Sequence, residues 1–126
     1  MPKDFFSAEP QRDYSNMYLR GVFNWWEASE SFKLLPIAED TYAVTIELIA
    51  DGQPYDFKVA DAAWTMSLNC GSEYKGAVLS LGSEAVLNCE ADSLNLQFTP
   101  SATGNYRFIL DVSDNNEPEL SITRIE

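Results

Sequence analysis

The chain contains no histidine, and this absence removes many kinds of catalytic and metal site. Histidine is the side chain most used for proton transfer near neutral pH and the commonest transition-metal ligand. A Ser-His-Asp triad, a Cys-His dyad and a His-ligated zinc site are therefore excluded, and two cysteines are too few for a four-cysteine zinc site. A glycosidase needs only a carboxylate pair, but no pair stands out among the 20 acidic residues. We expect no metal, no cofactor and no enzymatic activity.

Basic residues are also scarce, since 8 Lys and Arg stand against 20 Asp and Glu and give a net charge of -12. This charge repels phosphate backbones and anionic membrane surfaces, so nucleic acid is not an expected partner. No segment approaches the roughly 20 consecutive apolar residues that a membrane-spanning helix needs. A neutral ligand, by contrast, is indifferent to the charge.

Cysteine is limited to Cys70 and Cys89. If paired, they would close a loop of about 20 residues, contribute about 3 kcal/mol to stability and indicate an oxidising compartment. The alternative is two unpaired thiols buried as small hydrophobic side chains. The start, "MPKDFFSAEPQRDYSN", lacks the apolar core of a signal peptide. We therefore expect either a periplasmic or extracellular protein whose leader was removed, or a cytoplasmic one.

What is present suffices for one packed domain, with 45% hydrophobic and 13% aromatic residues in a chain of 126. Residues 1–15 are polar and non-periodic and are predicted to be a flexible lead-in to a single domain over 16–126. In that domain, short alternating segments are separated by turn residues. The predicted strands are 16–24, 31–37, 41–50, 54–61, 93–99, 104–113 and 118–125, with less regular strands within 64–90.

This spacing of seven or eight strands, with no helix-period segment, predicts an all-β immunoglobulin-like β-sandwich. "DGQ" at 51–53 predicts a hairpin turn between two of the strands. Alternation along 54–61 places Phe57 and Val59 on the inner face and Lys58 on the outer face. The segment 104–113 alternates in the same way.

The segment "MYLRGVFNWWEAS" (17–29) begins like a strand and then places Trp25 beside Trp26. Neighbours in an extended chain point to opposite faces, so we expect one of this pair in the core and the other exposed for a function. The structural alternative is that both are partly buried, as is usual for tryptophan. Trp64 follows a predicted strand and is expected in a loop, where binding residues concentrate.

The apolar face of a pyranose ring is a suitable ligand for an exposed, neutral indole. Its hydroxyl groups would then need polar partners nearby. Lys58 and Asn24 are the candidate donors, and Asn69 and Asn95 are weaker candidates. The alternative for Lys58 is a solvated, outward-facing strand residue.

The segments "YLRGVFNWW", "TYAVTIEL", "YDFKVADAAW" and "GNYRFILDVS" together carry a resemblance to a known family. They resemble the starch- and glycogen-binding modules with an early-set immunoglobulin-like fold, most closely those found with bacterial pullulanase- and amylase-type enzymes. The resemblance covers 17–113 in order. It implies that Trp26 and Trp64 stack on glucose units and that Lys58 contacts hydroxyls. Trp25, at a position that is usually small, is then a core or accessory rim residue.

The sequence therefore predicts a non-catalytic module that binds α-glucan (starch, glycogen or maltooligosaccharide), and the resemblance implies that it is part of, or associated with, a glycoside hydrolase. The alternative is a structural or protein-interaction module that uses the same aromatic residues. The acidic segment "DVSDNNEPE" (111–119) is rich in calcium-type oxygen ligands. Its spacing matches no EF-hand, and an acidic turn usually faces water.

Overall fold

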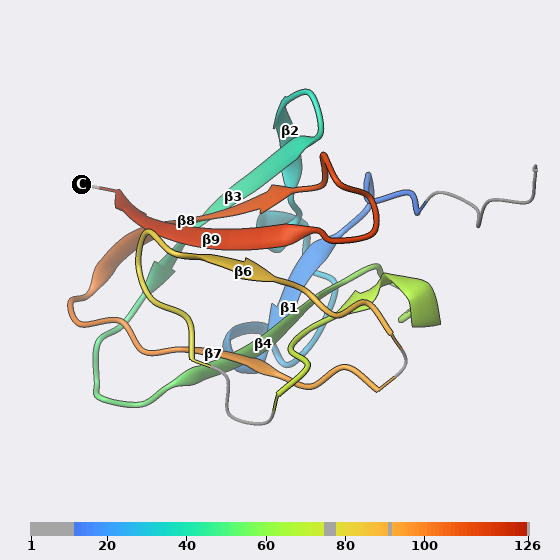
Figure 1. Ribbon diagram of the computed structural model, residues 1–126. Helices are drawn as coiled ribbons and strands as arrows, with labels where there is room; N and C mark the ends of the chain where they lie inside the picture. The colour runs from blue at the N-terminus through green and yellow to red at the C-terminus, as the bar shows by residue number, and fades with distance from the viewer. Residues whose placement is uncertain (1–11, 75–77, 91, 126) are drawn as a thin grey trace, which may run out of the picture.

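Two antiparallel sheets pack face to face in the computed structural model, which describes residues 12–74, 78–90 and 92–125 (Figure 1). The first sheet has the order β1 (Tyr18–Gly21), β4 (Tyr55–Ala60) and β5 (Asn69–Cys70), and β7 (Leu96–Phe98) also pairs with β4. The second has the order β2 (Leu35–Ala38), β3 (Thr41–Leu48), β8 (Gly104–Asp111), β9 (Glu119–Ile125) and β6 (Glu84–Val86). Three short 3-10 helices join the strands: η1 (Val22–Asn24), η2 (Glu30–Phe32) and η3 (Met66–Leu68). The predicted all-β sandwich is confirmed.

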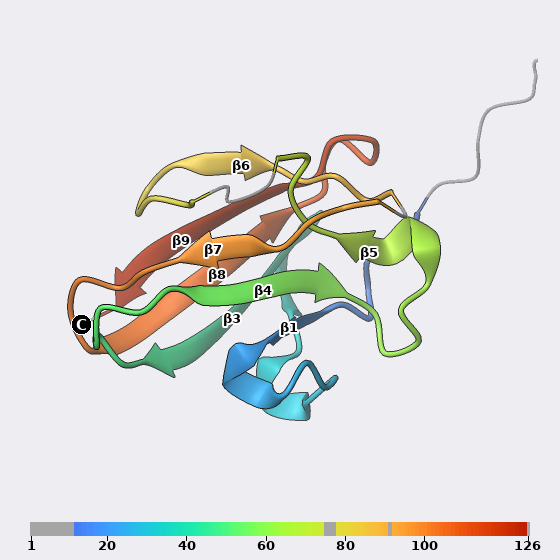
Figure 2. The same cartoon turned by 90° about the horizontal axis from the view of Figure 1, so that it is seen from below.

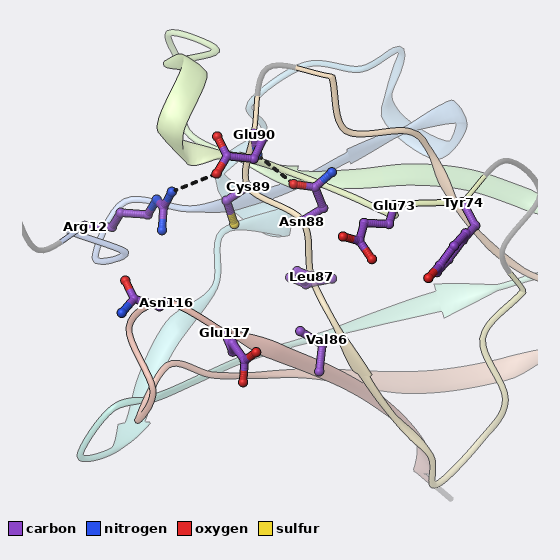
Figure 3. A pocket seen from close by; sticks show the side chains of 10 residues that line it. All are labelled: Arg12, Glu73, Tyr74, Val86, Leu87, Asn88, Cys89, Glu90, Asn116 and Glu117. Carbon is purple, nitrogen blue, oxygen red and sulfur yellow. Dashed lines mark hydrogen bonds and ion pairs between the residues drawn. The ribbon is translucent and has the colours of Figure 1, made fainter. Parts of the chain in front are cut away.

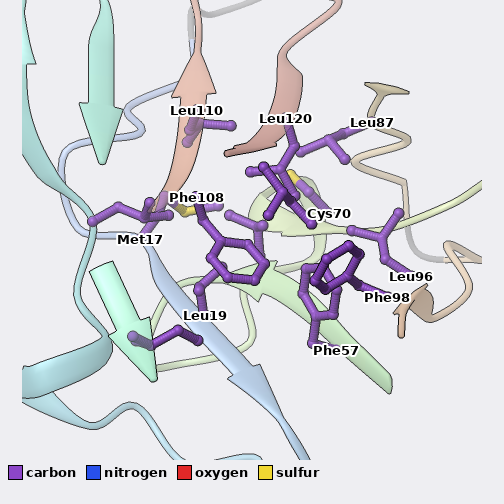
Figure 4. Close-up of a cluster of buried hydrophobic side chains, with 14 of the residues drawn as sticks. Met17, Leu19, Phe57, Cys70, Leu87, Leu96, Phe98, Phe108, Leu110 and Leu120 are labelled. Carbon is purple, nitrogen blue, oxygen red and sulfur yellow. The ribbon is translucent and has the colours of Figure 1, made fainter. Parts of the chain in front are cut away.

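The core forms between the two inner faces, as the alternation predicts. Phe57 and Val59 of β4 are fully buried, and so are the alternate residues of β8. Phe57 meets Phe108 across the sandwich with ring centroids 5.5 Å apart in an edge-to-face arrangement (Figure 4). Phe98 and Tyr106 make a second such contact at 5.4 Å. Edge-to-face pairs of this kind add to the stabilisation that burial of apolar area provides.

The predicted hairpin at 51–53 is wrong. β3 and β4 lie in different sheets, and β3 pairs with β8 along its whole length from Thr41–Asp111 to Leu48–Gly104. Gly52 does adopt a positive φ, so a turn is present, but the connection over residues 49–54 crosses from one sheet to the other (Figure 2). A turn signal shows where the chain reverses. It does not show which strand becomes the partner, and a six-residue connection can cross the roughly 10 Å between two sheets.

The predicted lead-in falls mostly outside the described residues, which begin at Arg12. Tyr14 from its last part is buried in the core cluster, and its hydroxyl donates to the carbonyl of Asn115 at 2.7 Å. The packed part of the domain therefore already includes Tyr14.

The predicted pair Cys70–Cys89 forms a disulfide, and both residues are buried. It fastens β5 to the segment that follows β6. Among the described residues, no helix is long and apolar enough to span a membrane.

Candidate functional site

The turn that carries two tryptophans is built by Gly21 and Asn24. A side chain at Gly21 would place its Cβ 2.5 Å from the carbonyl oxygen of Asp56 and 2.6 Å from the Cβ of Phe57, so only glycine lets β1 approach β4 this closely. Asn24 then locks the turn. Its Oδ1 accepts from the Gly21 amide and its Nδ2 donates to the Leu19 carbonyl, both at 3.0 Å. Asn24 is buried and its side chain is bonded to the backbone, so it is not the free donor to sugar hydroxyls that the sequence predicts.

Trp25 and Trp26 leave this turn in the left-handed conformation, with φ of 56° and 62°. The alternation argument assumed an extended chain and does not apply here. Trp25 is 88% exposed, so its interpretation as a core residue is wrong. Trp26 is half-buried, and its amide donates to the Gly21 carbonyl at 2.9 Å.

Trp64 lies in the loop between β4 and η3, as predicted, and is 37% exposed. The Asp61 carboxylate fixes this loop by accepting from the Thr65 amide at 2.8 Å and from the Thr65 hydroxyl at 2.6 Å. Trp64 also has a positive φ, of 55°. Four non-glycine residues in the described part of the chain have a positive φ, and three of them are Trp25, Trp26 and Trp64. Backbone strain of this kind tends to collect at functional sites.

Arg20 connects the two tryptophan-bearing segments. Its Nε donates to the Trp26 carbonyl at 2.7 Å, and its Nη1 donates to the carbonyls of Asp61 and Ala62 at 2.9 and 3.1 Å. Its Cζ also lies 3.8 Å from the centroid of the Trp64 ring. A planar guanidinium can make these bonds and stack at the same time. Trp26 and Trp64 are therefore held relative to each other by one buried side chain.

The environment of Arg20 keeps it charged. Burial lowers the pKa of Arg20, and the carboxylates of Asp61 and Glu27 oppose this effect. An arginine stays protonated in proteins under such conditions. Sequence reasoning missed Arg20. The available signal was an arginine in the "YLRG" strand, immediately before the glycine that starts the aromatic turn.

Lys58 is not at the surface. It is only 8% exposed, and its Nζ donates to the carbonyl of Ser93 at 2.9 Å. This burial lowers the pKa of Lys58. Lys58 is therefore neither the exposed sugar donor nor the solvated strand residue that the sequence predicts, and both interpretations are wrong. The segments that contain Gly71 and Ser93 lie over the outer face of β4, which alternation alone could not show.

The two weaker donor candidates differ in their placement. Asn95 is exposed, whereas Asn69 is half-buried and its Oδ1 has no hydrogen-bond partner among the described residues. Nor does any group of three or more His, Cys, Asp or Glu that could hold a metal occur in the part of the chain that the structure describes. What the site offers is the indole surface of Trp25, Trp26 and Trp64.

Comparison with known proteins adds a structural likeness. No family model matches the chain, and no curated protein matches its sequence. Its structure is similar to "Ligand induced structure of AmyP-SBD", an amylase starch-binding domain, with a TM-score of 0.65. The match covers 94% of this chain and 81% of that one at 16% identity. The chain has the fold of a starch-binding domain. At this identity the likeness concerns the fold alone, and it carries no specific link to pullulanases.

Proposed function

We propose that the chain is a non-catalytic α-glucan-binding module in which Trp26 and Trp64 stack on glucose units. The observation that carries this proposal is the Arg20 network, which holds two partly exposed indoles from separate loops as one unit. Exposed tryptophans with strained backbones are costly, and a ligand-binding role accounts for that cost. The fold likeness to a starch-binding domain supports the same conclusion.

The contacts define how a sugar would bind. The guanidinium of Arg20 covers one face of the Trp64 ring, so the sugar contacts the opposite face. Trp25, as the most exposed indole, forms the rim. Because Asn24 and Lys58 already bond to backbone carbonyls, stacking supplies most of the affinity. A site of this kind binds weakly, with a Kd of about 10 µM to 1 mM, or about -7 to -4 kcal/mol.

The test is a titration of intrinsic tryptophan fluorescence with maltoheptaose and β-cyclodextrin, with cello-oligosaccharide as the control. A saturable change with the two α-glucans alone is expected. Trp26→Ala and Trp64→Ala should each abolish most of the change while far-UV circular dichroism stays that of the wild type. If Trp26→Ala unfolds the domain, Trp26 is structural and the proposal fails. If millimolar glucan causes no change in the wild type, the exposed indoles serve a protein partner instead.

The setting of this module follows from the same features. We propose a starch-like polysaccharide or maltooligosaccharide as the ligand, and an association with a glycoside hydrolase, since the similar structure is an amylase domain. The Cys70–Cys89 disulfide supports a periplasmic or extracellular location, because disulfides persist in oxidising compartments.

A further inference from the structure

A pocket of about 500 Å³ lies away from the tryptophans, beside the disulfide (Figure 3). Four parts of the chain line it: Arg12, the residues 73–74, the residues 86–90 and the residues 116–117. None of the three tryptophans and no atom of Arg20 contributes to its wall. Pockets that bind small molecules have volumes of roughly 300 to 1,000 Å³, so this one is of a suitable size.

The wall of the pocket is fixed before any ligand arrives. Cys89 is bonded to Cys70 in the neighbouring sheet. The preceding residue, Asn88, exchanges two backbone hydrogen bonds with Gly71, both at 2.8 Å. A preformed wall means that binding does not have to pay for ordering this segment.

Arg12 supplies donors at one end of the pocket. Its backbone is anchored, because its amide donates to Oδ1 of Asn115 and its carbonyl accepts from Nδ2 of Asn115, both at 2.9 Å. The guanidinium is much less engaged. Its Nη2 lies 3.8 Å from Oε1 of Glu90, which is beyond hydrogen-bond distance, and its Nε has no partner among the described residues.

Acceptors and an aromatic surface occupy the rest of the pocket. The Tyr74 ring is 72% exposed and lies at the end opposite Arg12, next to the carboxylate of Glu73 (Figure 3). Glu117 and Asn116 form the side nearest β9. The pocket therefore combines a guanidinium that is loosely paired with Glu90, several carboxylate acceptors and one flat aromatic ring.

This combination selects the chemical class of the ligand. The carboxylates of Glu73, Glu90 and Glu117 repel an anion, while the guanidinium of Arg12, paired with Glu90, adds hydrogen-bond donors to the same wall. A hydroxyl group both donates and accepts, so a neutral polyhydroxylated ligand can bond to both kinds of group. The Tyr74 ring suits the apolar face of a pyranose. We propose that this pocket is a second binding site, for a neutral mono- or disaccharide, that is independent of the tryptophan site.

The test uses maltose and cellobiose with the whole chain, followed by the backbone amide signals in ¹⁵N-resolved NMR spectra. It is run in the wild type and in Trp26→Ala, so that the tryptophan site is silenced in one arm. We expect saturable shifts at Asn88, Glu90 and Asn116 with at least one sugar in both proteins, up to sugar concentrations of roughly 50 mM. If the pocket amides shift with sugar but α-glucan causes no change in the tryptophan fluorescence of the wild type, the proposed function is overturned and the second site stands.

Matched variants link the shifts to the pocket. Tyr74→Ala and Glu117→Gln should each weaken the sugar affinity at the pocket about tenfold or more. Tyr74 is mostly exposed, so its replacement leaves the fold in place. Glu84→Gln, which removes the same charge on β6 outside the pocket, should leave the affinity unchanged. The proposal is wrong if no sugar shifts the pocket amides, if Tyr74→Ala has no effect, or if a polyamine binds there in preference to both sugars.

Discussion

Arg20 shows how a single buried side chain can hold two partly exposed tryptophans in a fixed relation to each other. Trp26 and Trp64 lie on two different loops, and loops are generally more mobile than strands. The strand residue Arg20 bonds to carbonyls in both loops and stacks on Trp64. These contacts attach both loops to a strand of the sheet and so restrict the movement of Trp26 and Trp64.

Arg20→Lys is the corresponding test on the proposed function. Lysine keeps the charge, but its ammonium has no planar fork that could bond to Trp26 and Asp61 together and stack on Trp64. We expect the affinity for maltoheptaose to fall about tenfold or more, and the near-UV circular dichroism of the tryptophans to change while the far-UV spectrum does not. Arg107→Lys, at an exposed position of β8, is the control. Unchanged near-UV signal and affinity in Arg20→Lys would contradict the positioning role.

The strained conformation of Trp25 gives a second prediction. A non-glycine residue in the left-handed region costs about 1 kcal/mol, and the exposed Trp25 side chain offers little packing in return. Trp25→Gly should therefore raise the free energy of unfolding by up to about 1 kcal/mol in urea denaturation. Trp25→Ala keeps the left-handed strain and should change the free energy of unfolding by less than about 0.5 kcal/mol. A clear loss of stability in Trp25→Gly would mean that the indole packs against its surroundings in solution.

Some site residues could be predicted from sequence and others could not. Two adjacent tryptophans after a strand indicate an exposed aromatic, whichever way the chain turns. The burial of Lys58 and Asn24 depends on a covering segment and on a turn that bends the chain out of the strand. The covering segment and the turn are tertiary features, so the identity of Lys58 or Asn24 and its neighbours in sequence do not reveal them.

The β1–η1 junction is the element on which the site depends most directly. Gly21 packs against Asp56 and Phe57 with no room for a methyl group. Gly21→Ala must therefore push β1 away from β4, and overpacking of this kind costs about 1–3 kcal/mol. We expect this loss in urea denaturation, together with weaker α-glucan binding, because Trp26 bonds to the Gly21 carbonyl. Gly104→Ala is the control, since it has no positive φ and a Cβ there would meet only the flexible end of the Arg124 side chain, at 3.3 Å.

The strands themselves were largely predictable, because their alternating pattern records which face is buried. Their pairing was not. β3 and β4 each carry the signal of a hairpin strand, yet β3 pairs with β2 and β8, and β4 pairs with β1, β5 and β7. Such pairings bring together residues far apart in sequence, and only the packing of the complete sandwich selects them.

The disulfide gives an element-scale prediction as well. It joins residues 19 apart and fastens two segments that border both Lys58 and the pocket. Replacing both cysteines by serine should cost about 2–4 kcal/mol of unfolding free energy. Comparison of urea denaturation for this variant and the wild type, each with and without reductant, checks the value. Only the wild type should respond to reductant.

At the scale of the whole molecule, the net charge of -12 acts against the folded state. Glu119 shows this locally, since its pKa is raised above the ordinary 4.5 mainly by the charge of Glu84, with smaller contributions from burial and from Asp111, Glu117 and Asp114. A group whose pKa is raised by folding binds protons more readily in the folded state, so stability rises as the pH falls toward 4.5. In the opposite sense, hydrogen bonds from Ser15 and Ser113 lower the pKa of Asp13 and Asp111 below 3.8.

The melting temperature should therefore increase between pH 7 and about pH 5, and fall once the pH drops below 3.8, where protonation removes the hydrogen-bonded carboxylates. Added salt should raise the melting temperature at pH 7 and have less effect near pH 5. The reason is that salt screens the same repulsion between carboxylates that protonation relieves. Glu84→Gln should raise the melting temperature at pH 7 and flatten the rise toward pH 5. Thermal unfolding followed by circular dichroism at several pH values and ionic strengths measures all three effects. A melting temperature that falls steadily from pH 7 to pH 5 would show that carboxylates paired in the folded state outweigh this repulsion.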